Sequence, residues 1–372
     1  MKPLRILADD LTGALDCAAA FGAGVHVHLG HPATQNQRVM DGDIDIVATA
    51  TRDVPPTDLA ALLEPSLSWL RGAGVAFKKI DSLLRGNTFD EVDWLARQGG
   101  FQGVAMIPAF PAQHRITKQG QQWWRKLDGN VDPVAESITH SLQARGWRIE
   151  TGRNAPTFQS SATAWVPDVL TDQDLDMVAD FALQNTGWLW CGSAGLAHAL
   201  ARRLPSRPPA AVSTPETGQI VFISASHHTV THEQWRVLRA STLSATYLSG
   251  EELHAFESTS TNYPLLIDLS SATPLSSAQA TSLLQAQTKV IAQHSQRPRA
   301  LVVVGGDTLL ALCRALGAHS LVSETALDRT GWGCARLSGG TWDGVLCHTR
   351  SGAFGNANDL IEVMNLLERN FS

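Results

Sequence analysis

Short apolar runs of β type alternate with helical stretches along the first two hundred residues of the chain. The runs predict strands at residues 5–8, 25–29, 44–50, 75–80, 104–107 and 188–191. The stretches between them predict helices at residues 11–21, 59–70, 89–97 and 194–204. Strands that alternate with helices predict an α/β fold with a mostly parallel sheet covered on both faces.

A proline-rich segment separates this pattern from a second one. Residues 205–215 hold four prolines, which continue neither a helix nor a central strand. The alternation then restarts, with strands predicted at 220–224, 265–269 and 300–304 and helices at 231–239, 278–294 and 308–316. We therefore predict two α/β domains, 1–205 and 217–372, joined by a linker over 206–216. Ligand sites favour domain interfaces and the carboxyl ends of parallel strands, so we expect an active-site cleft between the domains.

Composition narrows the class of protein. The 372 residues are 44% hydrophobic and 17% charged, which is enough apolar material for a sizeable core. No apolar run approaches the roughly 20 residues of a membrane helix, and the N-terminus does not resemble a signal peptide. The net charge of −6 argues against non-specific nucleic-acid binding. Five cysteines without a C-x-x-C pair indicate reduced thiols, so we expect a cytoplasmic protein, and oligomerisation stays open.

Several familiar catalytic motifs are absent from the sequence. No Gly-Lys dipeptide occurs, which excludes a Walker A loop, and no G-x-G-x-x-G supports a Rossmann dehydrogenase. No H-E-x-x-H occurs either. The segment C-G-S-A-G at 191–195 resembles a nucleophile elbow but has Cys where the first Gly must be, so a serine hydrolase is disfavoured.

Two acidic residues, Asp9 and Asp10, lie where the first predicted strand meets the first helix. Adjacent carboxylates at the end of a strand need partners. One of them is readily explained as a helix cap whose oxygen accepts backbone N–H groups. A cap explains both less well, so a role in ligand chemistry and a role in capping are both open for this pair.

Two further loops follow predicted strands in the N-terminal half. The first places Lys79, Asp81, Ser82 and Arg85 together, a set that suits an anionic, hydroxylated small molecule, because Arg grips carboxylates and Asp accepts from hydroxyls. The alternative is a surface loop of salt bridges. The second, residues 108–120, contains Arg115 among prolines, and an exposed rigid turn is its alternative interpretation.

The C-terminal half contains three turns rich in small residues. The turn G-G-D-T at 305–308 follows a β-branched run and opens a helix, whose N-terminus offers free N–H groups to a phosphate. Asp and Thr are also ordinary helix caps, so this turn alone is a weak signal. The turns at 224–226 and 350–355 strengthen it, and together they favour a nucleotide site. Its candidate residues are Ser224, Ser226, Gly305, Gly306, Asp307, Thr308 and Gly352.

Taken in order, these motifs resemble those of the four-carbon acid sugar kinases, ATP-dependent enzymes that phosphorylate threonate, erythronate or 3-oxo-tetronate at the terminal hydroxyl. The resemblance is carried by L-A-D-D-L-T-G-A-L-D at 7–16, K-K-I-D-S-L-L-R-G-N at 78–87, P-A-F-P-A-Q-H-R-I-T at 108–117, G-S-A-G-L-A at 192–197, G-G-D-T at 305–308 and R-S-G-A-F-G at 350–355. The chain departs from the family pattern at Leu83 (usually Thr), Arg350 (usually Lys) and Ala353 (usually Asn).

The resemblance implies a division of labour between the two domains. The N-terminal domain would bind the sugar acid through Asp9, Lys79, Ser82 and Arg115, with Asp81, Asp10 and Arg85 as catalytic residues. The C-terminal domain would bind ATP through the three turns, with Mg²⁺ near Asp307. Either Arg85 or Arg115 would bind the substrate carboxylate, and either Asp81 or Asp10 would orient or deprotonate the hydroxyl. A catalytically silent sugar-acid sensor and an NAD-dependent sugar-acid oxidoreductase remain the alternatives.

Overall fold

The computed structural model describes most of the chain, which divides into two compact units, residues 1–208 and 209–372. The predicted linker at 206–216 lies outside the described residues. Those residues are 3–31, 43–126, 128–134, 137–153, 163–205, 218–242, 244–255, 263–324, 331–353 and 355–369.

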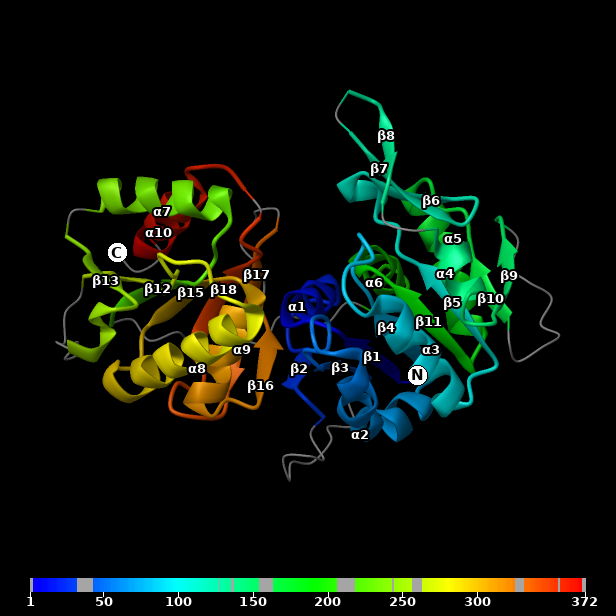
Figure 1. Ribbon diagram of the computed structural model, residues 1–372, viewed down its shortest axis with the longest axis horizontal. Coiled ribbons are helices and arrows are strands. Elements are labelled where there is room, and N and C mark those ends of the chain that lie inside the picture. The colour runs from blue at the N-terminus through cyan, green and yellow to red at the C-terminus, as the bar shows by residue number, and fades with distance from the viewer. Residues whose placement is uncertain are drawn as a thin grey trace. The chain divides into compact units, whose positions relative to one another are not determined.

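The first unit is built on parallel strands (Figure 1). Along the sheet they run in the order β2-β3-β1-β4-β11-β5-β10-β9, and every neighbouring pair is parallel. Their bounds are β1 Leu4–Ala8, β2 His26–Leu29, β3 Ile44–Ala48, β4 Val75–Lys79, β5 Gly103–Ile107, β9 Arg148–Thr151, β10 Thr163–Val166 and β11 Trp188–Gly192. Strands β2 and β3 lie on one side of β1 and β4 on the other, so the order reverses between β1 and β4. Such a reversal opens a crevice at the carboxyl ends of the two strands.

Helices pack in two groups against this sheet. Helix α6 contacts both α1 and α5, whereas α3 contacts both α2 and α4. A core of aliphatic and aromatic side chains, including Leu63, Val92, Leu95 and Met106, fills the space beneath α2, α3 and α4. The helix bounds are α1 Leu11–Ala20, α2 Leu59–Arg71, α3 Thr88–Gly99, α4 Ile138–Gln143, α5 Asp172–Gln184 and α6 Ala194–Ala201.

A separate antiparallel sheet projects from the first unit (Figure 1). It consists of β6 Arg115–Lys118, β7 Gln121–Arg125 and β8 Val131–Pro133. Residues 108–120, for which a rigid turn was one interpretation, therefore contain a strand. This small sheet carries Arg115 at the start of β6, next to the carboxyl end of β5.

The second unit repeats the parallel arrangement and adds an antiparallel part. Its strands run in the order β13-β14-β12-β15-β18-β17-β16, and β17 is antiparallel to both of its neighbours. Here the order reverses between β12 and β15. The strand bounds are β12 Ile220–Ser224, β13 Thr246–Ser249, β14 Leu265–Asp268, β15 Ala300–Val304, β16 Ser320–Ser323, β17 Gly333–Ser338 and β18 Leu346–Arg350.

In the described part of the second unit, helices pack in two pairs against the sheet. Helix α7 (Thr229–Ser241) packs against α10 (Asp359–Arg369), and α8 (Ser277–His294) packs against α9 (Gly306–Leu316). The core beneath α7 and α10 includes Phe222, Trp235, Val302 and Leu360. No helix in the described part of the chain is long and apolar enough to cross a membrane.

The predicted α/β class and the mostly parallel sheet are confirmed. Each predicted strand and helix corresponds to an observed one, with differences at the ends. The strand predicted at 44–50 ends at Ala48, because Ala50 has a φ of +57°, outside the range of strands. The helix predicted at 194–204 ends at Ala201. Strands β6 to β10, β13 and β16 to β18 and helices α4, α5 and α10 were not predicted.

Candidate functional site

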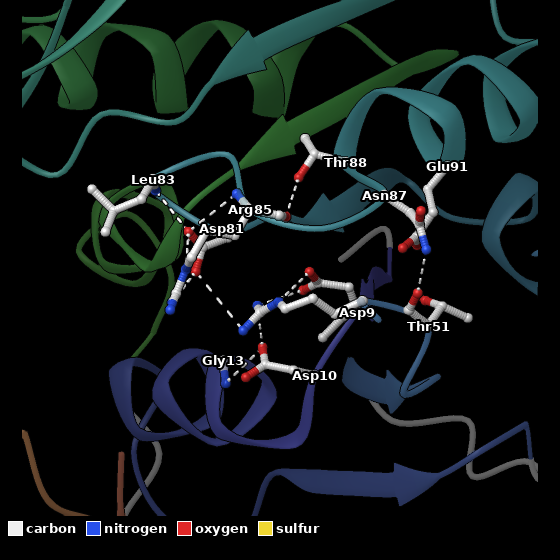
Figure 2. Close-up of polar contacts among 12 residues, drawn as sticks. Asp9, Asp10, Gly13, Thr51, Asp81, Leu83, Arg85, Asn87, Thr88 and Glu91 are labelled. Carbon is white, nitrogen blue, oxygen red and sulfur yellow. Dashed lines mark hydrogen bonds and ion pairs between the residues drawn. The ribbon is translucent and has the colours of Figure 1, made fainter. Parts of the chain in front are cut away.

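Four sequence-predicted residues of the first unit lie together at its strand-order reversal: Asp9, Asp10, Asp81 and Arg85 (Figure 2). Asp9 and Asp10 follow β1, and Asp81 follows β4, the neighbouring parallel strand. Because the carboxyl ends of parallel strands meet at one edge of a sheet, these carboxylates lie close together. The loop after β3 contributes Arg52, which the sequence analysis missed.

Asp10 caps helix α1, which was one of the two roles left open for the acidic pair. Its Oδ1 accepts a hydrogen bond of 3.1 Å from the backbone N–H of Gly13 and another of 2.7 Å from Nη2 of Arg52. Among the described residues nothing bonds to its other oxygen, Oδ2. The Asp10 side chain is 22% exposed, so this second oxygen is available to a ligand.

Asp9 is a different kind of residue, because it is buried. Its carboxylate receives two hydrogen bonds from Arg52, from Nε at 2.8 Å and from Nη2 at 3.0 Å. Burial raises the pKa of Asp9, but Lys78, Arg52 and Lys79 together outweigh burial and hold it below its usual value. Asp9 is therefore an ionised anchor for Arg52.

The two adjacent lysines of β4 point to opposite faces of the sheet, as strand geometry requires. Lys78 is fully buried, and its Nζ lies 2.6 Å from a carboxylate oxygen of Glu91 on α3. Lys79 extends toward α1, where a Cβ added to Gly13 would lie 2.3 Å from its Nζ. Burial lowers the pKa of Lys79, but Asp10 and Asp9 raise it above its usual value. Lys79 is therefore a buried cation beside the first turn of a helix.

The loop after β4 is organised by Asp81. Oδ1 of Asp81 accepts from the backbone N–H of Leu83 at 2.8 Å, and Nε and Nη2 of Arg85 bind the two carboxylate oxygens at 3.1 and 2.6 Å. Burial raises the pKa of Asp81, but Arg85, Arg52 and the Leu83 N–H lower it to about 2. Asp81 is thus firmly ionised. The Arg85 side chain is 65% exposed, so the salt-bridge interpretation of this loop holds for this pair.

Arg115 approaches the same loop from the small antiparallel sheet. Its guanidinium contacts the hydroxyl of Ser82 through Nη1, which also donates to the side-chain oxygen of Gln113 at 3.0 Å. Its Nε is buried with no hydrogen-bond partner. Both observed partners are neutral, so the charge of this half-buried guanidinium is uncompensated by direct contact.

Gln122 anchors the small sheet that carries Arg115, and the sequence analysis missed this residue as well. It is fully buried on β7, donates to the backbone oxygens of Ser82 at 3.0 Å and Pro108 at 3.2 Å, and accepts from Thr117 at 2.7 Å. These bonds join the small sheet to the loops after β4 and β5. A buried glutamine carries no recognisable signal in a single sequence.

The charges of this site nearly cancel. Four carboxylates lie among five cations, and Asp16 on α1 is a fifth carboxyl that interacts electrostatically with Lys79, Asp10 and Arg52. Among the described residues, Lys79 and Arg115 are the cations of the set with no carboxylate within 4.0 Å. The set consists of Asp9, Asp10, Asp81, Glu91, Arg52, Lys78, Lys79, Arg85 and Arg115. Such a site can bind an anion.

The predicted nucleotide turns of the second unit also lie at a strand-order reversal. They follow β12, β15 and β18, three neighbouring parallel strands. Gly305 has a φ of +108°, a conformation that glycine adopts readily, and it precedes the first turn of α9. At Gly352 an added Cβ would lie 2.2 Å from Oγ of Ser226, so the first and third turns touch there.

Individual residues of these turns have distinct local roles. Ser224 is fully buried, and its hydroxyl accepts from the backbone N–H of Ser226 at 3.2 Å, which shapes the first turn. Thr231 donates to the backbone oxygen of Gly352 at 2.7 Å. Thr308 is buried, whereas Asp307 is exposed at the start of α9. The described residues contain no cluster of three potential metal ligands.

Arg350, which stands where the family pattern has Lys, is held inside the second unit. Its Nη1 donates to Asp359 at 2.6 Å, its Nη2 contacts Gln234, and its guanidinium lies 5.2 Å from the Trp332 ring. Its side chain is 1% exposed. Arg350 therefore links β18 to α7 and α10.

Known proteins are similar to this chain in sequence and in fold. Residues 4–148 match the family of sugar-binding N-terminal domains. A D-threonate kinase of Cupriavidus necator is 33% identical over 64% of this chain and 63% of its own length, so the alignment spans less than two thirds of that relative. A D-threonate kinase of Bordetella bronchiseptica is 26% identical over 99% of this chain and 98% of its own. A 3-oxo-tetronate kinase of Burkholderia multivorans is 26% identical over 87% of this chain and 89% of its own length.

Two crystal structures have a similar fold. A Salmonella typhimurium LT2 protein superimposes with a TM-score of 0.71 at 18% identity, over 98% of each chain. A Haemophilus influenzae protein superimposes with a TM-score of 0.68 at 18% identity, over 97% of this chain and 99% of that one. The matched domain, the kinase relatives and the motifs shared along the sequence show that the chain belongs to the four-carbon acid sugar kinase family.

Proposed function

We propose that this protein transfers the γ-phosphoryl group of ATP to the terminal hydroxyl of a four-carbon sugar acid. The relatives are kinases of this substrate class. The observation that carries the proposal is Arg115, a half-buried guanidinium held by the neutral Ser82 and Gln113, with its Nε buried and unbonded. A carboxylate ligand would supply the countercharge and the missing acceptor.

The structure favours Arg115 over Arg85 as the group that binds the substrate carboxylate. Arg85 already binds both oxygens of Asp81. Burial lowers the pKa of Arg115, whereas a bound carboxylate would favour its charged form. Ser82, Lys79 and Asp9 complete the proposed acid site, with Ser82 beside Arg115 and Asp9 acting through Arg52.

Asp10 is the better candidate for the group that accepts the proton of the substrate hydroxyl. Asp81 has a pKa of about 2 and two bonds from Arg85, which make it a weak base. Asp10 keeps Oδ2 free of protein partners. In the proposed step the hydroxyl oxygen bonds to the γ-phosphorus and its proton passes to Asp10, while the bond between the γ-phosphorus and the bridging oxygen breaks and that oxygen leaves with ADP.

The turns of the second unit fit a nucleotide. Glycines at 305 and 352 stand where side chains would be strained or would collide with the neighbouring turn, and the first turn of α9 offers backbone N–H groups. We propose that Ser224, Ser226, Gly305, Gly306, Thr308 and Gly352 hold ATP and that Asp307 binds Mg²⁺. A Mg²⁺ ion held by one carboxylate and phosphate oxygens keeps several waters and needs no protein cluster. Acid and nucleotide would then be held by different units and brought together for transfer.

Formation of ADP tests the proposed function. Purified protein with ATP and Mg²⁺ should produce ADP with at least one of D-threonate, L-threonate, D-erythronate and 3-oxo-tetronate. Arg115→Gln should lower kcat/KM for that acid by about one and a half to three and a half orders of magnitude, because truncating one partner of a desolvated charge pair costs about 2–5 kcal/mol.

The matched control is Arg125→Gln, which removes an exposed charge from the same small sheet and should leave kcat/KM unchanged. Folded protein that forms no ADP with any of the four acids would contradict the kinase. If those acids still raised its unfolding temperature, the catalytically silent sensor would be the better description.

A further inference from the structure

Arg52 occupies the centre of the acid site without belonging to any motif that the sequence analysis recognised. It follows β3, and its guanidinium bonds to Asp9 and Asp10 and lies 3.8 Å from Oδ2 of Asp81. Figure 2 shows these three carboxylates turned toward a common centre from the loops after β1 and β4. One cation therefore connects both loops of the crevice.

The backbone of Arg52 is held as firmly as its side chain. Its N–H donates to the Asp9 backbone oxygen at 3.3 Å, and its own backbone oxygen accepts from the Asn87 N–H at 3.2 Å. The Asn87 side chain bonds to the backbone oxygens on either side, those of Thr51 at 2.9 Å and Val54 at 2.8 Å. An added Cβ on Gly86 would lie 2.4 Å from the Arg52 oxygen, and Gly86 has a φ of +72°. Gly86 and Asn87, at the end of the 78–87 motif, thus hold the Arg52 backbone in place.

We propose that Arg52 is a positioning residue that orients the Asp10 carboxylate for phosphoryl transfer. Arg52 and the Gly13 N–H both bind Oδ1 of Asp10, which fixes the carboxylate plane and leaves Oδ2 directed to the substrate. Bidentate contact with buried Asp9 keeps the guanidinium from turning away. This role rests on the proposed function, since it assumes that Asp10 receives the hydroxyl proton.

The variant Arg52→Lys tests the orientation of the Asp10 carboxylate separately from the positive charge at position 52. Lysine keeps the positive charge but lacks the planar fork that binds Asp9 and Asp10 together. We expect kcat to fall by about 10- to 100-fold, because a misplacement of about 1 Å in a catalytic group costs roughly 100-fold. The KM of the sugar acid should change less than about threefold, since Arg115 is untouched. A purely structural role would lower the unfolding temperature and leave kcat per folded molecule unchanged.

Two further variants keep the test decisive. The double variant Arg52→Gln/Asp9→Asn removes both charges of the buried pair, so it leaves no unpaired Asp9 if Arg52→Lys fails to fold, and it should show the same loss of kcat. Arg5→Lys is the matched control, because Arg5 pairs with Asp45 across β1 and β3 near the amino ends of those strands. Its kcat should equal that of the unaltered protein.

The outcomes separate this inference from the proposed function. Unaltered protein without kinase activity overturns the proposed function, and the role of Arg52 falls with it. Active unaltered protein combined with a normal kcat in folded Arg52→Lys, or in the folded double variant, overturns the role of Arg52 alone. A rise in KM at constant kcat would likewise contradict positioning of Asp10 and assign Arg52 to acid binding.

Discussion

Asp81 is the residue whose ionisation contributes most plainly to stability in the acid site. Its pKa is lowered from 3.8 to about 2 in the folded protein, so its interactions stabilise the fold above about pH 4 and are lost as the pH falls toward 2. Integration over the window from pH 5 to pH 3 gives a loss of about 1 kcal/mol from this carboxyl. Urea unfolding of the unaltered protein and of Asp81→Asn should show the destabilisation by the substitution shrinking by that amount between pH 5 and pH 3.

The comparison with Asp81→Asn isolates this carboxyl, because other groups titrate in both proteins. A free-energy difference between the two that stays constant from pH 5 to pH 3 would contradict the lowered pKa. It would also remove the main argument that Asp81 is too weak a base for the hydroxyl proton, and Asp81 would then rank equally with Asp10.

Sequence patterns predicted the carboxylates of the proposed acid site but not their partners. Asp9, Asp10 and Asp81 could be predicted because each follows an apolar strand, and the cap at Asp10 is a local feature. Arg52 also follows a strand, yet its bonds join positions 43 residues apart, which no local pattern encodes. The division of Lys78 and Lys79 between two faces of the sheet follows from strand alternation once β4 is placed.

At the scale of elements, the Lys78–Glu91 pair joins β4 to α3 within the core. Both side chains are essentially unexposed, and burial raises the pKa of Glu91 despite the nearby ammonium. Lys78→Met should destabilise the protein by about 3–5 kcal/mol, because it leaves a carboxylate buried without its countercharge. Chemical unfolding at neutral pH measures this cost.

The double variant Lys78→Met/Glu91→Leu is the control for that substitution. It replaces the pair by apolar side chains in a region that already contains Val92 and Leu95, so most of the stability should return. A double variant no more stable than Lys78→Met would show that the ammonium is required for another reason, such as its effect on the pKa of Asp9.

Strands β7 and β8 escaped prediction for a physical reason. Strand β7 has the sequence Q-Q-W-W-R, which shows no alternation of apolar and polar positions, and β8 is only three residues long and largely exposed. They are stabilised by pairing with one another and by the buried Gln122. The strands that were predicted, such as β1, β5 and β15, are buried along their whole length and therefore read as continuous apolar runs.

For the molecule as a whole, the two units share one topological feature, a reversal of strand order. Each places its candidate ligand residues where the strand order reverses, after β1 and β4 in the first and after β12 and β15 in the second. The sequence could predict two alternating segments, but the strand order that creates these crevices depends on long-range pairing. If acid and nucleotide bind at these two places, as proposed, each should bind independently of the other.

Two reciprocal variants test this independence in the full chain. Gly306 is the first residue of α9 and is not among the glycines of positive φ in the described residues, so valine fits its backbone, whereas Gly305 at +108° would be strained. Gly306→Val should abolish ATP–Mg²⁺ binding in calorimetry, because a side chain there blocks the approach of backbone to phosphate, and should leave intact the rise in unfolding temperature caused by the acid. Arg115→Gln should abolish the rise in unfolding temperature caused by the acid and should leave ATP–Mg²⁺ binding intact. Normal ATP binding by folded Gly306→Val would place the nucleotide elsewhere, and loss of both ligands in either variant would show that the two sites are coupled rather than independent.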